Sequence, residues 1–101
     1  MPIVVARGLR ARLFGLAFRR EMDADEALLI PRCRSVHTFG MRFAIDVVFL
    51  DGDGDVLEVR HHVRPGRVAC CHRARAVLET RAGESWRFLS PASRPAAPTG
   101  P

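Results

Sequence analysis

The chain has 101 residues, 48% of them hydrophobic, and a formal net charge of +5. This length suits one domain with one core, since single domains typically have roughly 100–150 residues. No apolar run approaches the ~20 residues of a membrane-spanning helix, and no secretory signal is visible at the start. An odd set of three cysteines does not make the disulfide framework of a small secreted protein. We therefore expect a cytoplasmic protein without a membrane segment.

The positive charge comes from arginine alone, because all sixteen basic residues are arginines. They are spread along the chain rather than gathered into one basic block. A charge of this size attracts polyanions weakly at low salt. We do not expect specific nucleic-acid binding from this pattern, and weak binding to nucleic acid remains an alternative.

The first predicted element is an amphipathic helix over residues 9–20. Leu9, Leu13 and Leu16 recur there at helical spacing, and arginines occupy the other side. At the far end, residues 90–101 hold four of the seven prolines, so we expect a disordered Pro-rich tail. The predicted folded domain therefore spans residues 3–89.

Short apolar segments between these ends predict strands, because β-branched residues and turn-forming residues alternate along the chain. The predicted strands are residues 27–30, 35–39, 46–51, 56–63 and 76–80, and residues 85–89 are a further extended candidate. Within the segment at residues 46–51, residues 47–50 are all apolar and leave no polar face. We therefore expect it to be covered on both sides.

The best-supported unit is a β-hairpin. Its loop, residues 51–55, reads DGDGD, and Asp-Gly pairs favour tight hairpin turns. The returning strand at residues 56–63 alternates, which predicts Leu57, Val59, His61 and Val63 on one face. Strands joined by hairpins, with one helix, predict a mainly β (α+β) fold. We expect a small curled antiparallel sheet or a partly open β-barrel with one N-terminal helix.

Residues 37–51 read HTFGMRFAIDVVFLD, a run that resembles the central motif of the domain of unknown function family 192, small bacterial and archaeal proteins. The resemblance covers roughly residues 9–84 and includes a Gly-Leu at residues 15–16, a Leu-Glu at residues 78–79 and an Ala-Gly at residues 82–83. This chain departs from the family pattern in having Ala44 where proline is usual, and in lacking the closing Gly-Asp turn and strand. The resemblance implies a mainly β fold with a helix, and no established activity.

Two sets of residues suggest metal binding, and neither has the spacing of a known site. Asp51, Asp53 and Asp55 alternate like calcium ligands. The EF-hand pattern fails at its sixth position, which is Val56 instead of glycine, and at its twelfth, which is His62 instead of glutamate. Aspartate and glycine are also ordinary hairpin-loop residues. The cysteines lack the paired spacing of zinc ligands, and free cysteines are commonly small buried hydrophobes. We therefore predict no metal and no cofactor.

The candidate site lies within residues 37–46, and consists of His37, Phe39, Met41, Arg42 and Asp46. A carboxylate at the start of an apolar strand needs partners, because its unpaired burial costs free energy. The structural interpretation is that Asp46 accepts backbone N–H groups or pairs with Arg42 or Arg34. The functional interpretation is that His37, Arg42 and Asp46 line a site for a small polar or anionic ligand.

These residues leave three functions open. The leading hypothesis is a noncatalytic binding module for a small ligand or a protein partner, with self-association through exposed strand edges as a further possibility. A small enzyme with a His37 and Asp46 acid–base pair is the first alternative. It requires the two side chains to meet in an open pocket. The second alternative, weak nucleic-acid binding, requires arginines gathered on one face.

Overall fold

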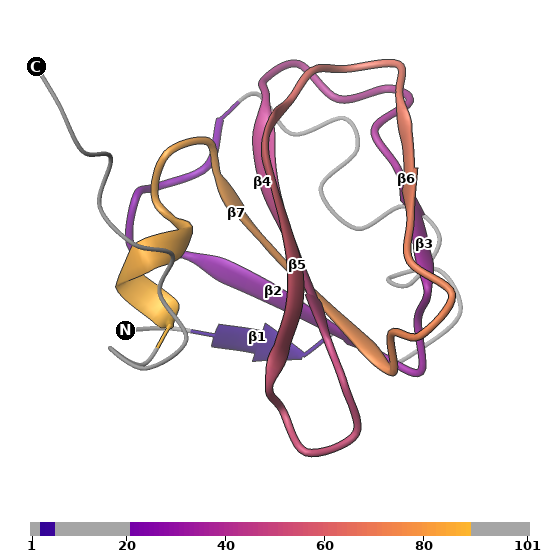
Figure 1. Cartoon of the computed structure of the whole chain (residues 1–101). Helices are drawn as coiled ribbons and strands as arrows, with labels where there is room; N and C mark the ends of the chain where they lie inside the picture. Colours follow the sequence, from indigo (N-terminus) through magenta and orange to yellow (C-terminus); the bar gives the residue numbers. More distant parts are fainter. Residues whose placement is uncertain (1–2, 6–20, 90–101) are drawn as a thin grey trace, which may run out of the picture.

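A computed structural model of the chain describes residues 3–5 and 21–89 (Figure 1). The helix predicted at residues 9–20 and the tail predicted at residues 90–101 lie outside the described residues. The described elements are β1 (Ile3–Val5), β2 (Ala27–Pro31), β3 (Ser35–His37), β4 (Ile45–Leu50), β5 (Val56–Val63), β6 (Val68–Cys70), β7 (Ala76–Arg81) and the 3-10 helix η1 (Ser85–Phe88).

The strands form a five-stranded sheet in the order β1-β2-β7-β4-β5 and a two-stranded sheet of β3 and β6. All neighbours pair antiparallel except β1 and β2, which pair parallel. The prediction of a mainly β fold is confirmed. The described strands do not close into a barrel, because β1 and β5 lie at opposite edges of the large sheet and do not pair with each other.

The central strand β4 separates two apolar clusters. The inter-sheet core lies between the large sheet and the β3–β6 sheet, where Val47 and Phe49 meet Val36 and Ala69. The η1-side core lies on the other face of the large sheet, where Val48 packs with residues that include Leu78 and Leu89. Figure 1 shows β3 and β6 on one side of the large sheet and η1 on the other. The prediction that this strand is covered on both sides is confirmed.

Two β-bulges interrupt the pairing of β5 with β4. Register shifts occur between Ile45 and Val47 and between Phe49 and Leu50. Each bulge inserts an extra residue and so reverses the face on which later side chains lie. Leu57 and Val63 consequently pack on the inter-sheet core, whereas Val59 packs on the η1-side core. The prediction that Leu57, Val59, His61 and Val63 share one face is therefore wrong.

The extended segment expected at residues 85–89 is also wrong, because residues 85–88 form η1. Gly83 turns the chain after β7 with a φ of 84°, a conformation that glycine adopts without steric cost. The backbone N–H of Leu89 bonds to the carbonyl of Trp86 at 3.5 Å. The segment thus folds back beneath the large sheet instead of adding a strand to it.

One acidic side chain is buried in the middle of the large sheet. Glu79 on β7 is 4% exposed and lies between Leu28 on β2 and Val47 on β4. Alternation along β7 places it on the same face as Val77, toward the inter-sheet core. Burial among apolar neighbours raises the pKa of Glu79 to about 7.

The raised pKa of Glu79 predicts an unusual dependence of stability on pH. The folded pKa of about 7 lies above the ordinary value of 4.5, so the folded state binds the proton more tightly than the unfolded state. The free energy of unfolding should therefore fall as pH rises from about 4.5 to about 7. The Glu79→Gln variant should exceed wild type at pH 8 by up to ~3 kcal/mol, and the gain should vanish near pH 4.

Urea denaturation at the two pH values measures this difference. A Glu58→Gln variant, which removes a carboxylate from β5, controls for the change in net charge. A gain for Glu79→Gln that is equal at both pH values would contradict the account.

Candidate functional site

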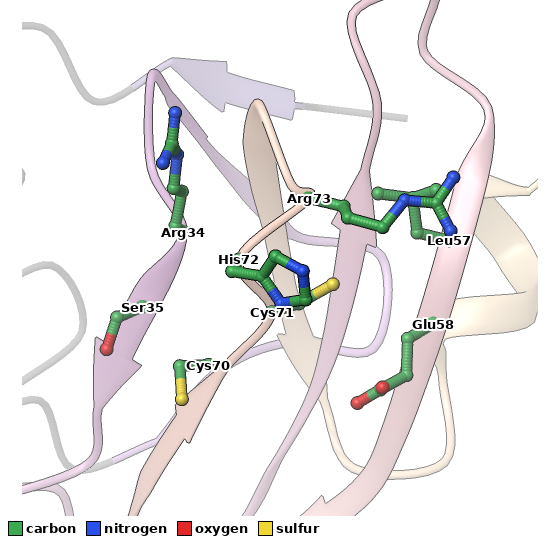
Figure 2. Close-up of a pocket in the computed structure, with 8 residues that line it drawn as sticks. All are labelled: Arg34, Ser35, Leu57, Glu58, Cys70, Cys71, His72 and Arg73. Carbon is green, nitrogen blue, oxygen red and sulfur yellow. The ribbon is translucent and has the colours of Figure 1, made fainter.

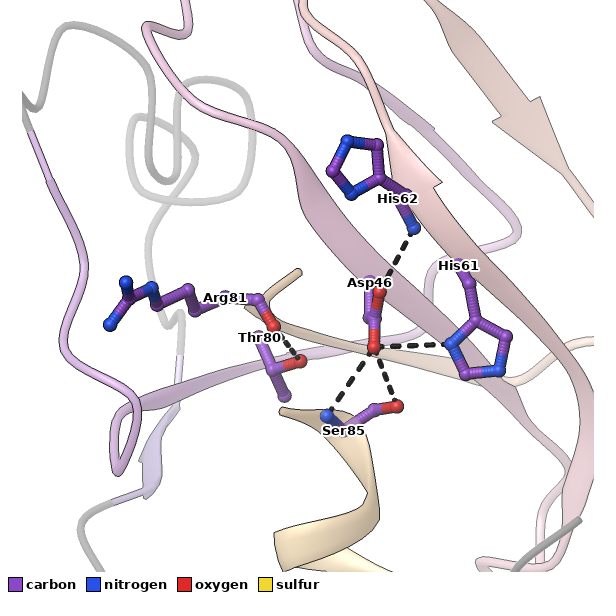
Figure 3. Close-up of polar contacts among 6 residues, drawn as sticks. All are labelled: Asp46, His61, His62, Thr80, Arg81 and Ser85. Atoms are coloured by element: carbon purple, nitrogen blue, oxygen red, sulfur yellow. Dashed lines mark hydrogen bonds and ion pairs between the residues drawn. The ribbon is translucent and has the colours of Figure 1, made fainter. Parts of the chain in front are cut away.

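Asp46 is a fully buried carboxylate at the start of β4. The first β-bulge sets two residues of β5, His61 and His62, opposite this single position. The Oδ1 atom accepts the backbone N–H of His62 at 2.9 Å. The Oδ2 atom accepts the Ser85 hydroxyl at 2.8 Å and the Ser85 backbone N–H at 3.4 Å, and lies 3.2 Å from the His61 Nδ1 atom (Figure 3).

These bonds decide the charge state of Asp46. Burial by itself raises the pKa of a carboxyl group, because it penalises the charged form. Hydrogen bonds from the His62 backbone, the Ser85 hydroxyl, the Gly83 backbone and the His61 ring oppose that effect. Together they bring the pKa of Asp46 below its ordinary value of 3.8. The side chain is therefore an ionised acceptor that joins β4, β5 and η1.

The structure does not bring His37 and Asp46 together. Asp46 shares a face of β4 with Val48, so it points toward η1. His37 belongs to β3, on the opposite side of the large sheet. The histidine beside Asp46 is His61 instead. Neither Arg42 nor Arg34 is a partner of the Asp46 carboxylate. The interpretation of Asp46 as an acceptor of backbone N–H groups agrees with this geometry, whereas the arrangement required for a His37 and Asp46 acid–base site is missing.

The remaining predicted site residues gather at the loop after β3. Phe39 is 54% exposed, and its ring stacks on the His37 ring with centroids 5.2 Å apart. The Phe39 backbone N–H donates to the His37 Nδ1 atom at 3.2 Å. Arg42 is exposed as well. Met41 differs, because it is 8% exposed and packs in the inter-sheet core.

Thr38, which sequence reasoning did not single out, holds this loop in place. Its buried hydroxyl donates to the Arg64 carbonyl at 2.7 Å and accepts the Arg67 backbone N–H at 2.8 Å. Its backbone N–H donates to the Arg67 carbonyl at 2.8 Å, and its carbonyl accepts the Gly66 N–H at 3.0 Å. The turn at residues 64–67 is therefore fastened against the Phe39 loop. In the sequence, only the proline and glycine of residues 64–67 indicated this turn, and nothing indicated its contact with Thr38.

Two segments that are distant in the chain come together on this side. Residues 32–45 and 59–75 hold all four histidines and no aspartate or glutamate. They also hold eight arginines: Arg32, Arg34, Arg42, Arg60, Arg64, Arg67, Arg73 and Arg75. The pairing of β3 with β6 joins the two segments, and their arginines include the exposed Arg42 and Arg67.

The acidic hairpin loop has the turn geometry that its sequence predicts. The Oδ1 atom of Asp51 accepts the N–H groups of Asp53 and Asp55, each at 2.9 Å. The three carboxylates are near enough to share an ion, but acidic groups in a loop are common without one. Cys33, Cys70 and Cys71 form no disulfide. Among the described residues, they take part in no group of three or more metal-ligating side chains.

The Asp46 contacts predict a structural role that can be measured. Asp46→Asn leaves an amide facing donors that need an acceptor, so the free energy of unfolding at pH 7 should fall by ~3 kcal/mol. The stabilising effect of Asp46 should be fully present above pH 3.8 and be lost as pH falls through its lower folded value. Asp25→Asn, at an exposed loop position, is the control for chemical denaturation. Equal stability of the two variants would contradict this role.

No helix in the described part of the chain is long and apolar enough to cross a membrane. The fold matches two solved structures. One is a protein of unknown function from Novosphingobium aromaticivorans DSM 12444, with 22% identity and a TM-score of 0.74 over 85% of this chain and 66% of that chain. The chain thus spans just under two thirds of the length of that protein.

The other structure is a protein from Sinorhizobium meliloti 1021 described as a "putative transcription regulator", with 24% identity and a TM-score of 0.74 over 85% of this chain and 72% of that chain. At such low identity, both likenesses show the fold alone. None of the curated proteins compared matches the chain. A model of the DUF192 family, described as "Uncharacterized ACR, COG1430", matches residues 1–88. The chain belongs to this family, which confirms the resemblance found in its central motif.

Proposed function

We propose that this domain is a noncatalytic binding module that recognises an anionic partner through the loop after β3. The contact area, here named the Phe39 surface, consists of His37, Phe39, Arg42, Arg67 and Val68. The proposal keeps His37, Phe39 and Arg42 from the predicted site. It leaves out Met41 and Asp46, because both are buried in the framework of the fold.

The observation that carries the proposal is an exposed aromatic ring on a loop that is held rigidly. Phe39 is 54% exposed and Val68, opposite His37 in the β3–β6 register, is 59% exposed. The hydrogen bonds of Thr38 with residues 64–67 fix the backbone that precedes Phe39 and the backbone that precedes Val68. A preorganised aromatic side chain loses little entropy on binding, and such residues commonly dominate binding energy.

The charge around the Phe39 surface indicates the sign of the partner. Arg42 and Arg67 are exposed, and the two chain segments that meet here contain no acidic residue. A surface of this kind attracts negatively charged partners and speeds their association. A partner that combines negative charge with a flat or apolar group would therefore fit both features.

The surroundings of Asp46 support a noncatalytic function. General acid–base catalysis needs a carboxylate or imidazole that can reach a reacting group. The oxygens of Asp46 are instead occupied by donors from β5 and η1, and the carboxylate is 0% exposed. His37 and Asp46, the pair of the enzyme hypothesis, thus lie on opposite sides of the large sheet.

Binding to single-stranded nucleic acid is a second candidate, because the exposed Arg42 and Arg67 belong to the same surface as the Phe39 ring. Single-stranded nucleic acids bind where cationic side chains accompany exposed aromatic rings. Phe39 has one face against His37, which leaves the other face as a potential platform for a base. An acidic protein segment with an apolar residue matches the same chemistry.

The test uses two fluorescent probes, an oligothymidylate and a glutamate-rich peptide that contains one tryptophan. We expect at least one probe to bind at low salt and to lose affinity as salt rises. Phe39→Ala should weaken that binding about tenfold, since an aromatic stacking contact contributes ~1–3 kcal/mol. The free energy of unfolding should change little, because the ring is largely exposed.

Trp86→Ala is the matched control, because Trp86 is an exposed aromatic residue (49%) beside an arginine, Arg87, on the η1 side. Its removal should leave probe binding unchanged. Binding of neither probe, or equal loss in both variants, would overturn the proposal. Sedimentation of the same samples separates probe binding from self-association through the sheet edges β1 and β5.

A further inference from the structure

The molecule also has a pocket of about 540 Å³ between β5 and the far end of the β3–β6 sheet. Its lining includes Arg34, Ser35, Cys70, His72, Arg73 and Glu58 (Figure 2). This volume lies within the range of small-molecule sites, roughly 300–1,000 Å³. None of the five residues of the Phe39 surface lines it, so it is a separate site.

Backbone hydrogen bonds fix the two sides of the pocket relative to each other. The Cys71 N–H donates to the Arg34 carbonyl at 2.9 Å, which ties the start of β3 to the end of β6. The Ala74 N–H donates to the Cys71 carbonyl at 3.0 Å, closing a turn that carries His72 and Arg73. The pocket is therefore part of the fold, and is not a gap between two independent loops.

The lining is positively charged on balance. Figure 2 shows Arg34 on one side, Arg73 on the other and the His72 ring between them. Within residues 3–5 and 21–89, neither guanidinium group makes a hydrogen bond or an ion pair. The one acidic residue of the lining, Glu58, pairs with Arg60. The Arg60 guanidinium also donates to the Cys70 carbonyl at 3.4 Å, so the charge of Glu58 is already compensated.

We propose that this pocket binds a phosphate-type dianion, either inorganic phosphate or the phosphoryl group of a small phosphomonoester. Guanidinium groups bind phosphate oxygens through paired N–H donors. Both arginine side chains are exposed. In Figure 2 they extend in different directions, so binding requires them to turn toward a ligand between them. Ser35 supplies a neutral hydroxyl donor at the same site, and the imidazole of His72 adds an N–H group.

Inorganic phosphate and a phosphomonoester would make different contacts in a pocket of this size. Inorganic phosphate fills a small part of 540 Å³, whereas a phosphorylated sugar would also contact the apolar wall that Leu57 provides. A metal does not fit the described lining equally well. Cys70, Cys71 and His72 do not bring three ligand atoms together, and the described group that does so is the acidic hairpin loop.

The experiment is a ¹H–¹⁵N NMR titration of the full chain with inorganic phosphate, with ribose 5-phosphate and with unphosphorylated ribose. We expect saturable shifts at the amides of Ser35, Cys71 and His72 with both phosphate compounds and no shifts with ribose. Arg34→Gln and Arg73→Gln should each weaken binding about tenfold, as expected for loss of a charged hydrogen-bonding group. Thermal unfolding of each variant confirms that it is folded.

Arg81→Gln removes the same charge from an exposed position outside the pocket and should change the affinity less than twofold. An equal loss in this variant, or shifts that do not saturate, would show unspecific charge attraction and overturn the proposal. Phe39→Ala should keep phosphate binding. Failure at the pocket is thus distinguishable from failure at the Phe39 surface.

Discussion

The hydrogen-bonded carboxylate of Asp46 is the interaction on which the arrangement of this fold depends. It accepts donors from the bulged part of β5 and from the first residue of η1, and so joins three elements through one side chain. A buried charge is tolerated when such donors compensate its lost hydration. The same bonds hold His61 and Ser85 on the η1 side of the large sheet. The opposite side, where β3 and β6 pack, takes no part in these hydrogen bonds.

Thr38 has a comparable role on that opposite side. It is 1% exposed, and its backbone and hydroxyl connect the loop after β3 with the turn before β6. Asp46 stabilises the scaffold, whereas Thr38 fixes the backbone beside the exposed ring of Phe39. Both residues lie in the motif by which the family resemblance was recognised. The motif thus combines structural positions with positions that face solvent.

The sequence predicted the local elements better than their faces and neighbours. The strands at β2, β4, β5 and β7 and the hairpin loop followed from apolar runs and Asp-Gly pairs. The bulges of β5 could not be predicted, because its regular alternation gives no signal for an extra residue. Of the two interpretations of Asp46, the one with backbone donors agrees with the structure, but its histidine partner depends on one of those bulges. The meeting of residues 35–37 with residues 68–70 was missed for a similar reason, since the sequence gives no signal for the pairing of β3 with β6.

We propose that the β3–β6 side of the molecule is the binding surface and that the η1 side is scaffold. The most direct measurement is a map of backbone amide shifts on titration with the oligothymidylate or glutamate-rich probe at low salt. We expect shifts concentrated at residues 37–42 and 64–70, with little change at residues 83–88. Shifts centred on η1 and β1, with the loop after β3 unaffected, would contradict it.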